Sequence, residues 1–165
     1  MNKLAFFLQF EPNIPTLTHQ NGIEPFTRKN GKAGIHKTKE LEALEYFYMQ
    51  KLSKFKPVKP ILGAVLLETK WFFNGGDNCS SCRWRTKKPD SDNLVKTLKD
   101  CMSAVGFWKD DAQCQDITLK FDIPAKFKHG IFIQVSKIED NIRENMPSEN
   151  QIEQEVHRAI RRRGR

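Results

Sequence analysis

The sequence predicts an α+β fold, with a small mixed β-sheet packed by helices in a single domain and a further helix at the C-terminal end. Apolar runs typical of strands are interspersed with segments in which apolar residues recur at helical spacing. The expected order is strand, loop, helix, strand, helix, strand, strand, helix. A length of 165 residues suits one domain with a core and is short for two.

The first half of the chain predicts one strand, one long loop and one helix. Residues 4–10 form an apolar run that ends before Pro12 and predict a strand. Residues 13–36 show no periodicity and predict a loop, which at that length is usually functional or mobile. A helix is expected from Thr38, its N-cap, to about Lys54, with an apolar face of Leu41, Leu44, Tyr48 and Leu52.

The second half predicts three strands and two helices. Strands are expected at residues 60–73, 113–123 and 130–138, and a polar loop at 74–86. A helix is expected from about Asp92 to Val105, ended by Gly106, with an apolar face of Leu94, Leu98, Met102 and Val105.

The C-terminal segment predicts a separate amphipathic helix. Ser148 and Gln151 fit a capping box, and apolar residues then recur every four positions at Ile152, Val156 and Ile160. We therefore expect a domain at residues 1–140 and a basic helical tail at 141–165.

The formal net charge of +8 predicts a polyanionic partner. Lys and Arg are concentrated in residues 28–39, 51–59, 83–88 and 158–165, a distribution that favours nucleic acid over a uniformly basic, solvated surface. The residues expected to contact DNA are Arg28, Lys29, Lys32, Lys37, Arg83, Arg85, Lys87 and Lys88. No apolar run approaches the roughly 20 residues of a membrane span, and the N-terminus lacks the pattern of a signal peptide. We expect a cytoplasmic, nucleoid-associated protein without a membrane partner.

Four cysteines are present, and the absence of secretory features favours reduced thiols. Cys79 and Cys82 have the spacing of a zinc knuckle, but no second pair of ligands completes a tetrahedral set. Cys101 falls on the apolar face of a predicted helix, and Cys114 falls in a predicted strand. Free thiols are therefore expected, with a structural zinc as the alternative.

Acidic residues before and after the helix at 92–105 indicate a metal site. Asp90 and Asp92 stand at its entrance, and Asp110 and Asp111 follow the stop at Gly106. Carboxylates brought within about 4–6 Å repel unless a cation joins them. Oxygen ligands without His or Cys suit Mg²⁺ or Mn²⁺, which leaves positions open for phosphate oxygens and water.

Lys96 lies four residues after Asp92, on the same side of the predicted helix, where it could stabilise charge at a phosphate. A purely structural interpretation stays open. Asp92 could cap the helix and pair with Lys96, and Asp110 with Asp111 could form an exposed turn.

The run Asp90-Ser-Asp-Asn-Leu-Val-Lys96, then Asp100, then Gly106-Phe-Trp-Lys-Asp-Asp-Ala-Gln113, resembles the signature of RusA-type Holliday junction resolvases. The resemblance covers roughly residues 87–122. It implies a RusA-like α+β fold and a dimeric, Mg²⁺-dependent endonuclease, often encoded by a prophage, that nicks four-way DNA junctions symmetrically in recombination and repair. By position it implies that Asp90, Asp92 and Asp111 hold the metal and that Lys96 is catalytic.

The sequence thus favours a resolvase that acts on branched DNA as a homodimer, in a bacterium or a phage. Two other functions remain open. One is a nuclease for other branched DNA, such as flaps or forks. The other is a basic DNA-binding module without catalysis, whose acidic cluster is structural.

Overall fold

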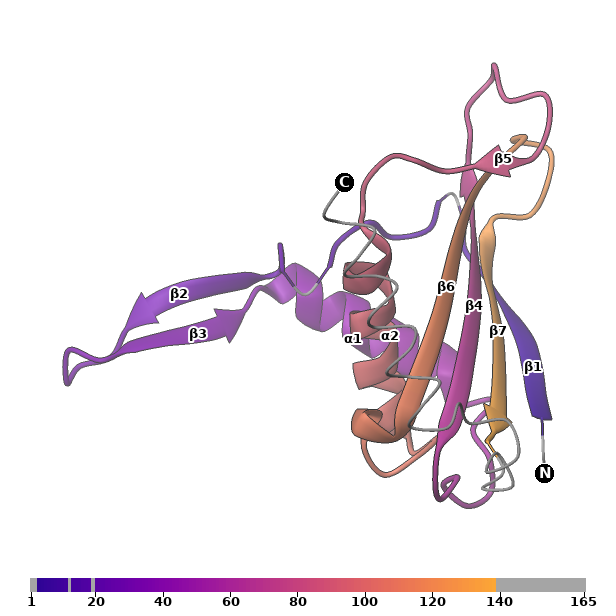
Figure 1. Ribbon diagram of the computed structural model, residues 1–165. Helices are drawn as coiled ribbons and strands as arrows, with labels where there is room; N and C mark the ends of the chain where they lie inside the picture. Colours follow the sequence, from indigo (N-terminus) through magenta and orange to yellow (C-terminus); the bar gives the residue numbers. More distant parts are fainter. Residues whose placement is uncertain (1–2, 12, 19, 139–165) are drawn as a thin grey trace, which may run out of the picture.

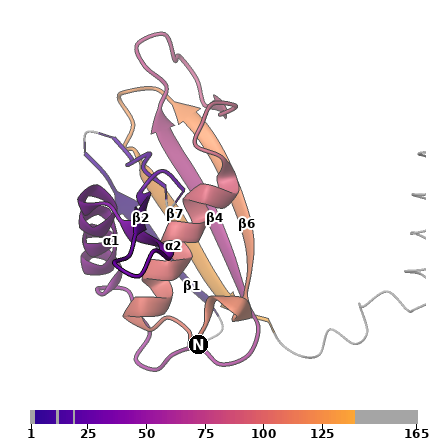
Figure 2. The same cartoon turned by 90° about the vertical axis from the view of Figure 1, so that its left-hand side faces the viewer.

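The computed structural model describes residues 3–11, 13–18 and 20–138 and has two layers (Figures 1 and 2). One layer is a 5-stranded sheet, and the other holds two helices that lie on the same face of it. The predicted α+β class is confirmed. The elements are β1 (Lys3–Gln9), β2 (Ile23–Thr27), β3 (Ala33–Lys37), α1 (Lys39–Leu52), β4 (Val65–Asn74), β5 (Arg83–Trp84), α2 (Ser91–Val105), the 3-10 helix η1 (Asp111–Gln113), β6 (Cys114–Ile123) and β7 (Gly130–Lys137).

The sheet is mixed, as predicted, in the order β1-β7-β4-β6-β5. The central strand β4 pairs with β6 in parallel and with β7 antiparallel. Parallel neighbours need a crossover connection, which α2 provides between β4 and β6. The N-terminus of α2 therefore lies at the end of the sheet where β4 and β6 finish, and its C-terminus lies where β6 begins.

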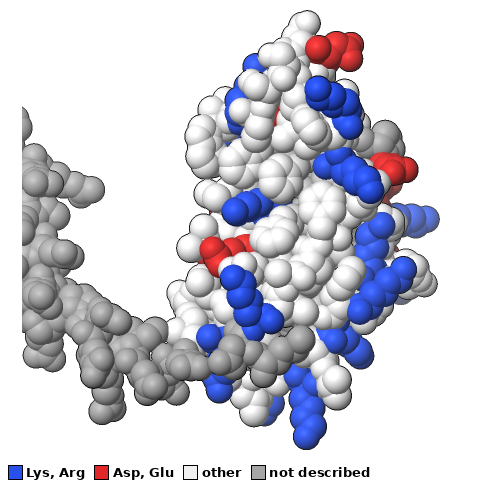
Figure 3. Space-filling view, turned by 90° about the vertical axis from the view of Figure 1, so that its right-hand side faces the viewer, with Lys and Arg blue, Asp and Glu red and all other residues white. Residues whose placement is uncertain are grey.

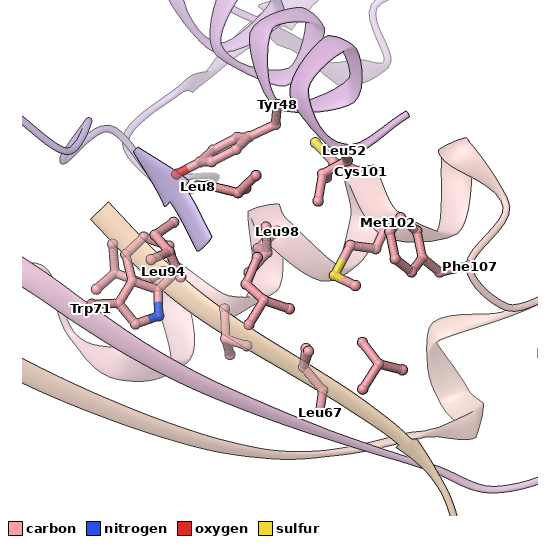
Figure 4. Packing of buried hydrophobic residues seen from close by; sticks show 14 of the residues in the cluster. Leu8, Tyr48, Leu52, Leu67, Trp71, Leu94, Leu98, Cys101, Met102 and Phe107 are labelled. Atoms are coloured by element: carbon pink, nitrogen blue, oxygen red, sulfur yellow. The ribbon is translucent and has the colours of Figure 1, made fainter. Parts of the chain in front are cut away.

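The core lies between the helices and the inner face of the sheet (Figure 4). On β4, alternate side chains face inward, and Val65, Leu67 and Trp71 are fully buried. Leu98 and Met102 of α2 pack against them from the helix layer. The predicted strand at 60–73 is observed from Val65 onward. Its start is later because Pro60 lacks an N–H and Gly63 turns the chain at a positive φ of 87°.

Both predicted helices within the described residues are confirmed with their end signals. The Thr38 side chain accepts a hydrogen bond from the Leu41 amide at 3.2 Å and so caps α1. Gly106 ends α2 in the left-handed conformation, at φ 95°. The next two residues, Phe107 and Trp108, are at most 1% exposed, so the chain turns after α2 through a buried corner.

The prediction of a structureless loop at 13–36 was wrong. Strands β2 and β3 form an antiparallel hairpin there, which projects from the body of the molecule (Figure 1). Nearly all of its residues are exposed on both faces, so it lacks the alternation of apolar and polar residues by which a half-buried strand is recognised. The predicted loop at 74–86 likewise contains the short strand β5.

The outer face of the sheet is not covered by α1 or α2. A row of aromatic rings crosses it, with centroid distances of 6.4 Å from Phe7 to Phe72, 5.4 Å from Phe72 to Phe121 and 4.7 Å from Phe121 to Trp84. Figure 3 shows a broad uncharged area on this side of the molecule, with basic side chains around it. Trp84 ends the row and is 66% exposed.

Two further expectations concern the rest of the chain. The amphipathic helix expected from Ser148, and with it the tail assigned to 141–165, lies outside the described residues. Within the described part, no helix is long and apolar enough to cross a membrane.

Candidate active site

The first two acidic residues of the predicted site lie at the N-terminus of α2, and both are exposed. Asp90 is the N-cap residue, but its side chain makes no capping hydrogen bond. Asp92 follows in the first turn. Neither carboxylate takes part in an ion pair with any described residue, so the alternative in which Asp92 caps the helix and pairs with Lys96 is not observed. Both carboxylates are therefore available to a ligand.

Lys96 lies one turn further along α2 and is also exposed. Its spacing of four residues places it on the same side of the helix as Asp92. The end of α2 therefore presents two carboxylates and one ammonium group to solvent on adjacent turns.

The backbone that leads into Asp90 is held by two half-buried cations, Arg85 and Lys120. The Arg85 guanidinium donates to Asp122 Oδ1 at 2.6 Å and to the Lys88 carbonyl at 2.9 Å. Lys120 Nζ donates to the Pro89 carbonyl at 2.7 Å and to the Lys87 carbonyl at 3.2 Å. The carbonyl groups of residues 87, 88 and 89 thus all accept hydrogen bonds from Arg85 or Lys120. These bonds fix the position of Asp90 at the start of α2.

Arg85 was expected to contact DNA, but in the structure its side chain is engaged within the protein. Its side chain is only 14% exposed, pairs with the buried Asp122 and lies 4.3 Å from the centroid of the Phe73 ring. Arg83, Lys87 and Lys88 are exposed, as a DNA contact requires.

Asp122 and Lys120 were not identified from the sequence as residues that support the site. The signal for them was two charged residues at alternate positions near the end of the strand predicted at 113–123, because a charge that a strand buries needs a partner.

Asp110 and Asp111 lie at the opposite end of α2. The helix has 15 residues, so its ends are separated by about 22 Å at a rise of ~1.5 Å per residue. Asp110 is the N-cap of η1, where its carboxylate accepts from the Ala112 amide at 2.8 Å. The carboxylate of Asp111 makes no such bond. Among the residues that the structure describes, no three acidic, His or Cys side chains are grouped closely enough to hold a metal. One chain therefore does not bring Asp111 to Asp90 and Asp92.

A polar pocket of about 410 Å³ opens beside Asp90. The segment before β2 forms one wall, and Asn93 Nδ2 donates to Gln20 Oε1 across it at 3.2 Å. Part of the segment predicted as a functional or mobile loop is therefore part of the site. The lining residues are Thr16, Thr18, Gln20, Asn21, Arg85, Lys88, Pro89, Asp90 and Asn93.

All four cysteines are free thiols in the structure. Cys79 is buried and donates to the Ser81 carbonyl at 3.2 Å, whereas Cys82 is exposed. Burial raises the pKa of the Cys101 thiol to about 12 and that of Cys114 to about 11, so both stay protonated at neutral pH.

Exposed carboxylates at one helix end, beside a polar pocket and several cations, are typical of enzymes that hydrolyse phosphodiesters. Comparison with known proteins agrees with this class. The family of the endodeoxyribonuclease RusA matches residues 17–136. A crossover junction endodeoxyribonuclease RusA of Lactococcus phage r1t is 28% identical over 123 residues, which cover 67% of this chain and 82% of the phage protein. The chain belongs to the RusA family of endodeoxyribonucleases.

Proposed function

We propose that this nuclease resolves four-way DNA junctions by paired symmetric nicks and that it depends on Mg²⁺, with Mn²⁺ as a substitute. The observation that carries the proposal is the pair of exposed carboxylates, Asp90 and Asp92, without a partner among the described residues, at the entrance of α2. Family membership and the junction endonuclease activity for which the phage relative is named support the choice of a junction as substrate.

The donor set at the entrance of α2 fits Mg²⁺. This ion prefers oxygen ligands and is commonly held by one or two carboxylates, with waters and substrate phosphate oxygens in its other positions. Asp90 and Asp92 supply two such carboxylates, and neither is committed to a cap or an ion pair with a described residue. When bound there, the metal would neutralise charge on the phosphate and lower the pKa of a water. Lys96, one turn away, would stabilise negative charge on the leaving oxygen.

A second copy of the chain is the source we propose for the third carboxylate, Asp111. On its outer edge, β6 pairs with β5 at Phe121 and Asp122, and the Arg85 amide donates to the Lys120 carbonyl at 3.0 Å, so residues 114–119 form an open edge among the described strands. Antiparallel pairing of two such edges would set Cys114 of one copy near Lys120 of the other. Lys120 contacts the Pro89 carbonyl, next to Asp90. Asp111, three residues before Cys114, would then approach the partner's metal site.

The same two-fold arrangement suits the substrate. A four-way junction has approximate two-fold symmetry and requires two cuts, and a dimer of this kind carries two equivalent sites. The homodimer and the shared site are thus one proposal.

Cleavage of a synthetic four-way junction tests the function. We expect symmetric nicks with Mg²⁺, none with chelator, and little cutting of a linear duplex of the same sequence. Binding without cutting in Mg²⁺ and in Mn²⁺ would contradict the proposal and favour a DNA-binding module. If a flap or a fork is cut in preference to the four-way junction, the proposed metal-dependent cleavage would stand, but the proposed substrate would be wrong.

The carbonyl contacts of Lys120 lead to a first prediction. Lys120→Met keeps the apolar stem but removes the donors to the Lys87 and Pro89 carbonyls. We expect the Mg²⁺ concentration for half-maximal cleavage to rise about tenfold, because a lost preorganising interaction of ~1.4 kcal/mol corresponds to a factor of ten. Metal titration of cleavage, with the melting temperature measured in parallel, checks this.

Lys70→Met is the matched control, since Lys70 is exposed on β4 and its ammonium group lies 5.9 Å from the centroid of the Phe132 ring. Lys120→Arg, which retains a donor, should recover part of the metal affinity. An unchanged metal requirement in Lys120→Met would show that these bonds do not position Asp90.

A further inference from the structure

We propose that the β2–β3 hairpin, residues 23–37, is a protein arm that enters a groove of duplex DNA. It would bind the double-stranded branch of the junction that passes the active site. The inference extends the proposed function, because it assumes that the substrate is DNA with double-stranded arms. It does not depend on the metal or on cleavage.

The charge of the arm is one-sided. Its tip carries Arg28, Lys29 and Lys32, all exposed and without an ion pair among the described residues. No acidic residue occurs from Pro25 to Lys37. The tip is also a defined turn, since the Arg28 amide donates to the Lys32 carbonyl at 2.8 Å. Three cations held at one point, with no acid beside them, suit the phosphate backbone.

Charges of opposite sign appear only at the base of the arm. Glu24 lies 3.5 Å from His36, and Lys37 donates to Glu45 of α1 at 2.7 Å, a bond that raises the pKa of Lys37. Lys37, expected from the sequence to contact DNA, is thus engaged in anchoring the arm to the body. The Thr38 amide completes the anchor by donating to the Gly22 carbonyl at 2.8 Å.

The shape of the arm fits a DNA groove. Five residues on each strand give a ribbon about 17 Å long, at ~3.3 Å per residue, and a two-stranded ribbon fits the major groove, which is about 12 Å wide. The arm projects away from the sheet and helices (Figure 1), so both of its sides are open to a ligand. The Phe26 ring lies over Gly34, where a Cβ would come within 2.7 Å of it, and this contact supports the ribbon without a core.

The arm starts at the active site. Gln20 and Asn21, which line the pocket beside Asp90, lead through Gly22 into β2. A duplex whose backbone reaches Asp90 would therefore pass the base of the arm. The 17 Å of ribbon corresponds to about five base pairs at ~3.4 Å each. The arm could thus contact phosphates within about half a turn of the cut.

The test is the salt dependence of DNA affinity in a variant with all three tip cations removed, Arg28→Ala with Lys29→Ala and Lys32→Ala. Affinity for a labelled four-way junction is measured by anisotropy in chelator, so that nothing is cut. Each neutralised phosphate contributes about −0.9 to the slope of log affinity against log salt. We expect the slope to become shallower by about 2.7 in this variant, equally for junctions of different sequence.

The matched control removes the same charge elsewhere, with Lys3→Ala, Lys70→Ala and Lys137→Ala, three exposed lysines outside the arm. An unchanged slope in the tip variant, or an equal change in the control, would overturn the proposal. So would a change in oligomeric mass without a change in slope, because the arm would then hold a second copy of the chain. If the wild type prefers linear duplex to junctions, the proposed substrate fails while the slope test on duplex still decides the role of the arm.

Discussion

Asp92→Asn is expected to abolish nicking of a four-way junction while junction binding stays as tight as in the wild type or becomes tighter. The substitution replaces an exposed carboxylate in the first turn of α2 by a neutral group of the same shape. A neutral oxygen is a poorer ligand for Mg²⁺, so the metal is lost. Removal of a negative charge beside the pocket also reduces repulsion of the phosphate.

Cleavage and binding are measured separately, by nicking in Mg²⁺ and by anisotropy in chelator. Asp77→Asn serves as the control, because Asp77 is an exposed acid outside the site and the change in charge is identical. Wild-type nicking by purified Asp92→Asn would show that the metal is not held at the entrance of α2.

A mixture of two inactive variants, Asp92→Asn and Asp111→Asn, is expected to regain nicking when the subunits are exchanged. If each site combines Asp92 of one copy with Asp111 of the other, a mixed dimer has one site with both substitutions and one intact site. Random exchange makes about half of the dimers mixed, so about a quarter of all sites in a two-fold dimer recover. The recovered product should be a single nick per junction.

This experiment separates a shared site from one built within a single chain. In the latter case both sites of the mixed dimer carry one substitution, and the mixture stays inactive even when mass measurements show that mixed dimers form. Asp110→Asn gives a control at the same turn, since Asp110 caps η1 and is expected to affect stability rather than metal binding.

The local parts of the fold could be predicted from the sequence because their signals are local. Thr38 and Gly106 mark helix ends, and both make the capping arrangements expected of them. The hairpin was missed although a signal was present. The dipeptide Asn30-Gly31 is typical of tight hairpin turns, and Gly31 has a positive φ of 79°. The alternation of apolar and polar residues that marks a half-buried strand is absent, because a hairpin without a core has no buried face.

The candidate site was predicted in part. Asp90, Asp92 and Lys96 lie near one another because they belong to the N-cap and the first two turns of α2. Asp111 does not join them within one chain, and the length of the predicted helix between them already implied this separation. The support from Arg85 and Lys120 depends on pairing between β5 and β6, which spacing along the chain does not reveal.

The three tryptophans of the chain give it a built-in optical probe. Trp71 and Trp108 are at most 1% exposed, whereas Trp84 is 66% exposed and directly precedes Arg85, whose side chain holds the backbone of the site. Collisional quenchers in solution reach an exposed indole far more readily than a buried one. The quenchable part of the intrinsic fluorescence therefore comes mainly from Trp84, and its protection reports on occupancy of the outer face of the sheet without an attached dye.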